Sequence, residues 1–187
     1  RLSEDPKSGS AVRPIRMLEA FKEIGYEVTE VLGYSSERKN AISALRKEIR
    51  AGARFDFCYM ETTTMPIALG DPGHLPLRPF LDLRFLSFLK QNGVPIFLFY
   101  RDVYWNFPAY GKKLSPFKRN GALLFYRFEL CILYKLVNFL YLPSERMGKY
   151  VPGGHAELKR ALPPGCSSGS TVEKVSGSDL RLIYVGG

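Results

Sequence analysis

Along this chain, segments whose apolar residues recur at helical spacing alternate with segments whose apolar residues recur at strand spacing. Residues 12–24 carry apolar side chains at helical spacing and Gly25 ends that pattern, whereas residues 26–32 alternate and are rich in β-branched side chains. The first stretch predicts a helix and the second a strand. The same analysis predicts further helices at 35–51, 79–91 and within 114–137, and further strands at 55–60, 94–100 and 139–142.

Strands and helices therefore alternate at intervals of roughly thirty to forty residues. This rhythm is typical of βαβ units. Residues 94–100 are almost entirely apolar, as expected of a strand that is covered on both faces. We expect an α/β fold with a doubly wound, mostly parallel sheet and helices on both faces, in a Rossmann-like three-layer α/β/α arrangement.

The composition changes after residue 162. Residues 163–179 are rich in Ser, Gly and Pro, which predicts a linker or an exposed loop, and residues 180–187 read as a strand. We expect residues 1–162 to form one domain and residues 180–187 to be the first strand of a second, missing domain. Whether a first strand of the sheet lies before Arg1 stays open at this point.

Charge and composition narrow the choice of partner. The chain has 187 residues, with 27 basic and 18 acidic side chains and a net charge of +9, so it should prefer anionic partners. Two histidines and three widely spaced cysteines argue against a zinc site or a disulfide framework, and they fit a reducing cytoplasm. Residues 122–142 have the length of a membrane span, but Arg127, Glu129 and Lys135 interrupt them.

Ligands of parallel sheets bind beyond the carboxyl ends of the strands, so polar residues there are candidates. Ser8, Gly9 and Ser10 form a turn before a predicted helix, which suits a phosphate or a sugar hydroxyl. Glu61 and Thr62 follow the strand at 55–60 and offer a carboxylate and hydroxyl for a polyol. For both sites the alternative is an ordinary solvated turn.

The most informative segment follows the most apolar strand. Arg101 and Asp102 stand there beside Tyr104, Trp105 and Asn106. A carboxylate, a guanidinium, an amide and aromatic faces are what carbohydrate recognition requires, since aromatic rings pack against sugar C–H faces. The alternative is a structural Arg–Asp pair beside a packed Trp.

Residues 101–136 hold seven basic side chains and two acidic ones, interleaved with aromatic residues. Lys112, Lys113, Phe117, Lys118 and Arg119 form the core of this segment and predict contact with an anionic membrane surface. A surface that binds single-stranded nucleic acid would use the same basic and aromatic side chains. A core helix with a solvated basic end is the third interpretation.

An ordered series of short elements resembles the amino-terminal domain of GT-B glycosyltransferases, in particular the large retaining family 4 (group 1). The elements are Ser8-Gly9-Ser10, Ile24-Gly25-Tyr26-Glu27-Val28, Arg101-Asp102, Leu162-Pro163-Pro164-Gly165 and Ile183-Tyr184-Val185-Gly186-Gly187. They are similar, in that order, to the family's acceptor loop, its helix-to-strand turn, its His-Asp pair, the element before its linker and the start of its donor domain. Arg101 departs from the family's histidine.

The resemblance implies that this chain is the acceptor-binding half of an enzyme that transfers a sugar from a nucleotide sugar, without a metal or cofactor, in polysaccharide or glycolipid synthesis. Asp102 and Arg101 would be catalytic, and Gly186 and Gly187 would contact the donor phosphate. A retaining reaction is favoured, whereas in an inverting enzyme Asp102 would be the base. Without the donor domain the chain should be inactive. We expect a cytoplasmic protein, peripheral on the inner face of the plasma membrane. The alternative is a non-catalytic basic module that binds nucleic acid or another anionic partner.

Overall fold

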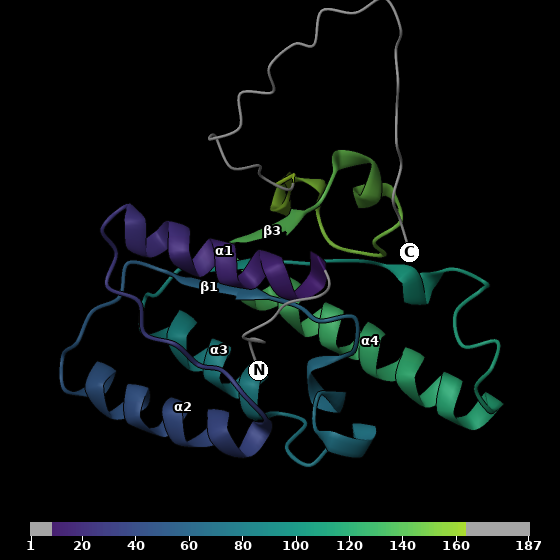
Figure 1. Ribbon diagram of the computed structural model, residues 1–187, viewed down its shortest axis with the longest axis horizontal. Helices are drawn as coiled ribbons and strands as arrows, with labels where there is room; N and C mark the ends of the chain where they lie inside the picture. Colours follow the sequence, from purple (N-terminus) through teal and green to yellow (C-terminus); the bar gives the residue numbers. More distant parts are fainter. Residues whose placement is uncertain (1–8, 164–187) are drawn as a thin grey trace, which may run out of the picture.

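The computed structural model describes residues 9–163, which form a parallel sheet with helices on both faces (Figure 1). The α-helices are α1 (Gly9–Glu23), α2 (Ser35–Arg50), α3 (Leu81–Gln91) and α4 (Pro116–Leu136). The strands are β1 (Cys58–Glu61), β2 (Ile96–Phe99), β3 (Phe139–Leu142) and β4 (Lys159–Ala161). Short 3₁₀ helices are η1 (Ile67–Leu69), η2 (Pro72–His74), η3 (Tyr104–Asn106), η4 (Glu145–Lys149) and η5 (Ala156–Leu158).

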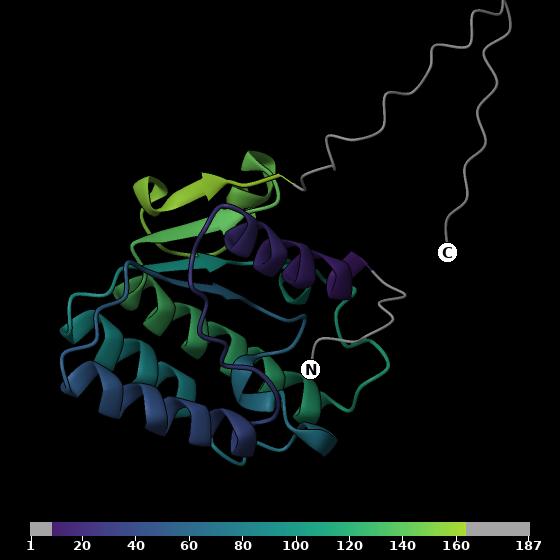
Figure 2. The same ribbon diagram turned by 60° about the vertical axis from the view of Figure 1, so that its left-hand side comes forward.

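The four strands are parallel and lie in the order β1-β2-β3-β4. Helix α1 covers one face, and α2, α3 and α4 lie on the other, which gives the expected three-layer α/β/α arrangement (Figure 2). Because α3 and α4 connect strands that advance in one direction, right-handed crossovers place both helices on the same face. The strand order does not reverse within residues 9–163.

The two faces of the sheet differ in composition, because successive side chains of a strand point to opposite sides. Ile96, Leu98 and Leu140 are fully buried in a core shared with α3 and α4. The other face is aromatic, and Phe97 stacks on Phe139 with ring centroids 6.1 Å apart. Phe21 of α1 packs on this aromatic face, where it contacts Phe57 and Tyr59.

The prediction of a strand over residues 26–32 is wrong. Gly25, with φ of 98°, ends α1, and within the described chain the following residues pair with no strand. They connect α1 on one face with α2 on the other, past the edge strand β1, where Tyr26 contacts Phe57. Val28 and Val31 are partly buried, whereas Leu32 is exposed. Because the partly buried positions, Val28 and Val31, are three residues apart, burial here does not follow the two-residue period of a strand, and the β-branched composition alone led to the wrong assignment.

The remaining boundaries agree more closely with the predictions, with two exceptions. Helix α1 begins at Gly9 rather than at residue 12, and the strand β4, Lys159–Ala161, was not predicted. The predicted strand at 180–187, with Gly186 and Gly187, lies outside the described residues, as does the linker beyond Pro163. Within residues 9–163, no helix is both long enough and apolar enough for a membrane crossing.

A buried carboxylate fastens the segment after β1 to α4. Glu129 of α4 accepts hydrogen bonds from the backbone N–H groups of Ile67, at 2.7 Å, and Ala68, at the start of η1. Tyr126, one turn earlier, donates its hydroxyl to the carbonyl of Thr64. Burial raises the pKa of Glu129 to about 8, although the backbone hydrogen bonds oppose this. Helix α4 thus fixes the path of the chain as it leaves the carboxyl end of β1.

Candidate functional site

The carboxyl ends of β1 and β2 are tied together by Thr62. Its N–H donates to the Phe99 carbonyl at 2.9 Å, and its hydroxyl accepts from the N–H of Arg101 at 3.1 Å. Thr62 is buried, so this hydroxyl is engaged with the backbone. The sequence analysis placed Thr62 in contact with an acceptor. The structure instead gives it a positioning role, because it holds Arg101 at a fixed place beyond the strand.

Glu61, the last residue of β1, is surrounded by donors. Arg101 Nη2 lies 3.2 Å from Glu61 Oε2, Arg13 Nε lies 3.4 Å from Glu61 Oε1, and the Tyr59 hydroxyl donates to Glu61 Oε1 at 2.8 Å. We call these four residues, Arg13, Tyr59, Glu61 and Arg101, the edge cluster. Burial, with the nearby Glu61 charge, raises the pKa of Tyr59, so its hydroxyl stays protonated and donates. Both Glu61 oxygens are engaged, which leaves this carboxylate little capacity for a sugar hydroxyl.

Arg13 comes from the second turn of α1 and was not among the predicted site residues. Its guanidinium lies over the ring of Phe99, 3.7 Å from the centroid, in a cation–π contact. Arg13 Nη2 is buried and meets no hydrogen-bond acceptor within residues 9–163, and the Nε contact with Glu61 is an ion pair rather than a well-formed hydrogen bond. Two guanidinium groups around one carboxylate give the edge cluster a net positive charge.

Asp102 follows Arg101 and starts a turn. One carboxylate oxygen, Oδ1, accepts the N–H of Tyr104 at 3.2 Å, a local hydrogen bond that holds the carboxylate over the start of η3. The structural Arg101–Asp102 pair, which was the alternative in the sequence analysis, is not formed, and Arg101 instead contacts Glu61 at this edge. Tyr104 is 56% exposed and offers an aromatic face immediately beside Asp102.

Trp105 has a different role from the one that the sequence analysis favoured. It is only 3% exposed, its ring stacks on Tyr126 at 5.1 Å, and its Nε1–H donates to the Tyr100 hydroxyl at 2.8 Å. A ring in this position has no free face for a sugar. The structure therefore favours the packed-Trp alternative, because a large ring after a buried strand gains more from the core than from the surface.

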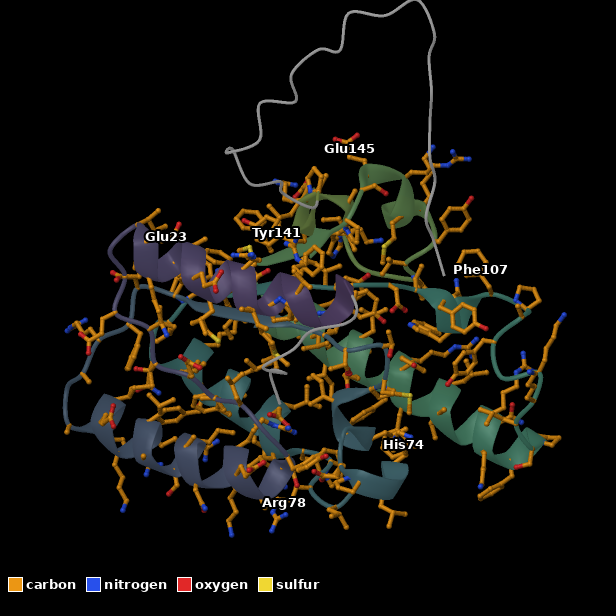
Figure 3. The ribbon with its side chains drawn as sticks, viewed as in Figure 1. Glu23, His74, Arg78, Phe107, Tyr141 and Glu145 are labelled. Carbon is orange, nitrogen blue, oxygen red and sulfur yellow. The ribbon has the colours of Figure 1, made fainter. Side chains whose placement is uncertain are left out.

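The exposed aromatic residues at the ends of η3 and η4 are instead Tyr104, Phe107 and Tyr150. Phe107 and Tyr150 contact one another with ring centroids 5.4 Å apart, and Phe107 lies at the margin of the molecule (Figure 3). Asn106 is exposed and donates its amide to the Tyr150 carbonyl at 2.9 Å, so it joins η3 to the segment after η4. Tyr150 was missed because more than forty residues separate it from Asn106, and no local pattern signals that contact.

The glycine-containing turn before the first helix is not a separate loop. Gly9 and Ser10 belong to the first turn of α1, while Ser8 lies outside the described residues. A pocket of about 480 Å³ is formed by η4, by β4 and by the residues before β4, and its charged lining residues are Glu145, Lys149, Lys159 and Arg160. Burial lowers the pKa of Lys159, whose ammonium already donates to two carbonyls. No group of acidic, His and Cys side chains suited to a metal occurs in the described part of the chain.

The predicted membrane-facing residues are mostly exposed. Lys112, Lys113 and Lys118 point into solvent, and Phe117 is 88% exposed. Arg119 is the exception, since it is half-buried and its Nε donates to the Tyr110 carbonyl at 2.9 Å. It holds the loop before α4 in place and contributes less to the surface than the sequence analysis expected.

Comparison of the chain with protein-family models, with curated proteins and with solved structures finds no match.

Proposed function

We propose that this chain is the acceptor-binding half of a glycosyltransferase that transfers a sugar from a nucleotide sugar to a hydroxyl group. The observation that carries the proposal is the pairing of two features at adjoining strand ends. One is the positively charged edge cluster, and the other is Asp102 beside the exposed ring of Tyr104. In parallel α/β sheets this edge is where ligands bind.

Each feature corresponds to a part of such a reaction. The ring of Tyr104 suits the C–H face of an acceptor sugar, and Asp102 accepts a hydrogen bond from a sugar hydroxyl through the oxygen that the turn does not use. Arg101, held by Glu61 and by Thr62, places positive charge at the same edge of the sheet, one residue before Asp102 in the chain. That charge suits the diphosphate of a donor or of a lipid-linked acceptor.

The proposed chemistry is a retaining transfer. The acceptor oxygen bonds to the anomeric carbon as the bond from that carbon to the donor phosphate breaks, and the acceptor proton passes to the departing phosphate. Asp102 orients the hydroxyl in this scheme and does not need to take the proton. No metal or cofactor is required, and the donor nucleotide is bound by a second domain.

Saccharide binding tests the proposal directly. Ligand-observed NMR on residues 1–187 with a panel of oligosaccharides and short-chain lipid-linked saccharides should detect binding, and Tyr104→Ala should abolish it. Tyr26→Ala is the matched control, because Tyr26 is also an exposed tyrosine but lies beside Phe57, before β1. Transfer of labelled sugar from a panel of nucleotide sugars is measured on the full-length protein.

The proposal fails if no saccharide in the panel binds and no donor supports transfer. It also fails if Tyr26→Ala and Tyr104→Ala reduce binding equally, since the loss would then not belong to this edge. A tight gel shift with single-stranded oligonucleotides, in the absence of saccharide binding, would favour the alternative of a basic binding module.

A further inference from the structure

Helix α4 has an apolar stripe on its solvent side. Phe117 and Leu124 are 88% and 69% exposed, and Phe128 is also exposed. At 100° per residue these three side chains fall within about 40° of one another around the helix axis. The stripe extends over roughly 17 Å at 1.5 Å per residue. The opposite side of α4, with Ala122, Tyr126 and Leu130, is buried in the core, so the stripe is not needed for packing.

A neighbouring segment widens the stripe. Phe80, just before α3, is exposed and contacts Phe128 with ring centroids 6.1 Å apart. Leu75 and Leu77, after η2, are exposed as well. The amino-terminal half of α4 lies at the margin of the molecule (Figure 1), which leaves this surface accessible. We call Phe80, Phe117, Leu124 and Phe128 the apolar stripe.

The charges around the stripe have one sign. Exposed basic side chains of the segments that form and flank it include Arg84, Lys112, Lys113, Lys118 and Arg127. The acidic residues between 72 and 144 are Asp82, Asp102 and Glu129, and each is buried or only partly exposed. Asp82 is in addition paired with Arg38 at 2.8 Å. Apolar side chains with a basic rim and without exposed carboxylates complement an anionic lipid surface.

We propose that the apolar stripe of α4 and its basic rim attach this protein to anionic membranes. The helix lies along the interface, the stripe enters the acyl boundary, and the lysines contact lipid phosphates. The attachment does not depend on the proposed transferase activity. Membrane attachment requires no groove on the protein. The apolar stripe meets this condition, because Phe117, its most exposed ring, projects from the surface of α4.

Co-sedimentation with vesicles tests the proposal. We expect residues 1–187 to bind phosphatidylcholine vesicles more strongly as the fraction of phosphatidylglycerol rises, and to be released by salt. Phe117→Ser should lower the partition coefficient at least about tenfold, the loss expected when a phenyl ring no longer leaves water. Because Phe117 is almost fully exposed, this change should leave the fold intact.

Two triple variants that lose the same charge distinguish the effect of the basic rim from the effect of the protein's net charge. Changing Lys112, Lys113 and Lys118 to Ser should lower partitioning roughly a hundredfold, at about fivefold for each residue. The control changes three exposed lysines elsewhere, Lys39, Lys47 and Lys149, to Ser and lowers the net charge by the same amount. Equal losses in both triple variants would overturn the proposal.

Fluorescence distinguishes a bilayer from other anionic partners. Phe117→Trp places an indole on the stripe, while the only native tryptophan, Trp105, is buried and provides a constant background. With anionic vesicles its emission should shift to the blue and be quenched by brominated acyl chains. An equal shift with heparin or oligonucleotides, or no quenching by brominated lipid, would refute insertion into a membrane.

Discussion

Glu129 should make the stability of this protein fall as the pH rises. Glu129 is only 6% exposed, and its carboxyl group accepts a backbone hydrogen bond from Ile67 at 2.7 Å. Burial raises its pKa from the ordinary 4.5 to about 8. Between these two values the folded protein holds one proton more than the unfolded chain. The free energy of unfolding must therefore decrease with increasing pH across that window.

The pKa shift sets the size of this effect. At most about 1.4 kcal/mol of stability is lost for each pH unit between the two pKa values. Over the window from 4.5 to about 8 the total has an upper limit of about 5 kcal/mol. Such a loss is a large part of the stability of an ordinary domain. Below pH 4.5 the carboxyl is protonated in both states and the effect disappears.

The pH dependence of the unfolding free energy can be measured by urea unfolding followed by Trp105 fluorescence. Trp105 reports on this region because its indole stacks on Tyr126, which lies in α4 together with Glu129. The comparison variant is Glu129→Gln, which keeps an acceptor for the backbone N–H groups but does not titrate. The difference in unfolding free energy between the two proteins should shift in favour of Glu129→Gln from about pH 4.5 to about pH 8. All other titrating groups are common to both proteins and cancel. Parallel pH profiles would show that the burial of Glu129 has been misjudged.

Four further substitutions test the site and the fold. In the proposed glycosyltransferase, Asp102→Asn should lower kcat at least about tenfold with unchanged thermal unfolding, whereas an unchanged rate with a large stability loss would make Asp102 structural. Glu61→Gln should destabilise the fold by about 3 kcal/mol in urea titrations, because two guanidiniums lose a buried counter-charge. Trp105→Phe should cost about 1–3 kcal/mol by circular dichroism through the lost hydrogen bond and cavity; a change near zero would argue against its place in the core. Gly154→Ala should lower Tm, since φ is 72° and the new methyl would overlap the Tyr134 ring; an unchanged Tm would contradict that packing.

Sequence analysis located β2 and β3 from their continuous apolar composition, and it located β1 although all four residues of that strand are only partly buried. Residues 94–100 contain β2, and residues 139–142 are β3 in full. Strand β4 was not predicted because Lys159 and Arg160 are charged, and because three residues are too few to show the alternation of apolar and polar side chains that is typical of a strand. The strand predicted over residues 26–32 is wrong because alternating, β-branched composition also occurs in this unpaired connection, in which Val28 and Val31 alone are partly buried.

At the candidate site, the sequence predicted which residues lie at the strand ends but not which side chains contact one another. The end of an apolar strand marked Glu61, Arg101 and Asp102 as candidates, because parallel strands present their carboxyl ends at one edge. That Arg101 pairs with Glu61 rather than with its neighbour Asp102, and that Arg13 joins them from α1, depends on the packing of α1 over β2. Such contacts between distant segments leave no local pattern in the sequence.

The strand order β1-β2-β3-β4 has a consequence for how the domain is assembled during synthesis. Each strand pairs with the one made immediately before it, from Cys58 with Ile96 to Leu140 with Lys159. Among β1 to β4, none must be inserted later between two strands that have already paired. Residues 9–163 can therefore add each strand to a growing edge as the chain leaves the ribosome, which limits the time that any apolar strand waits without a neighbour.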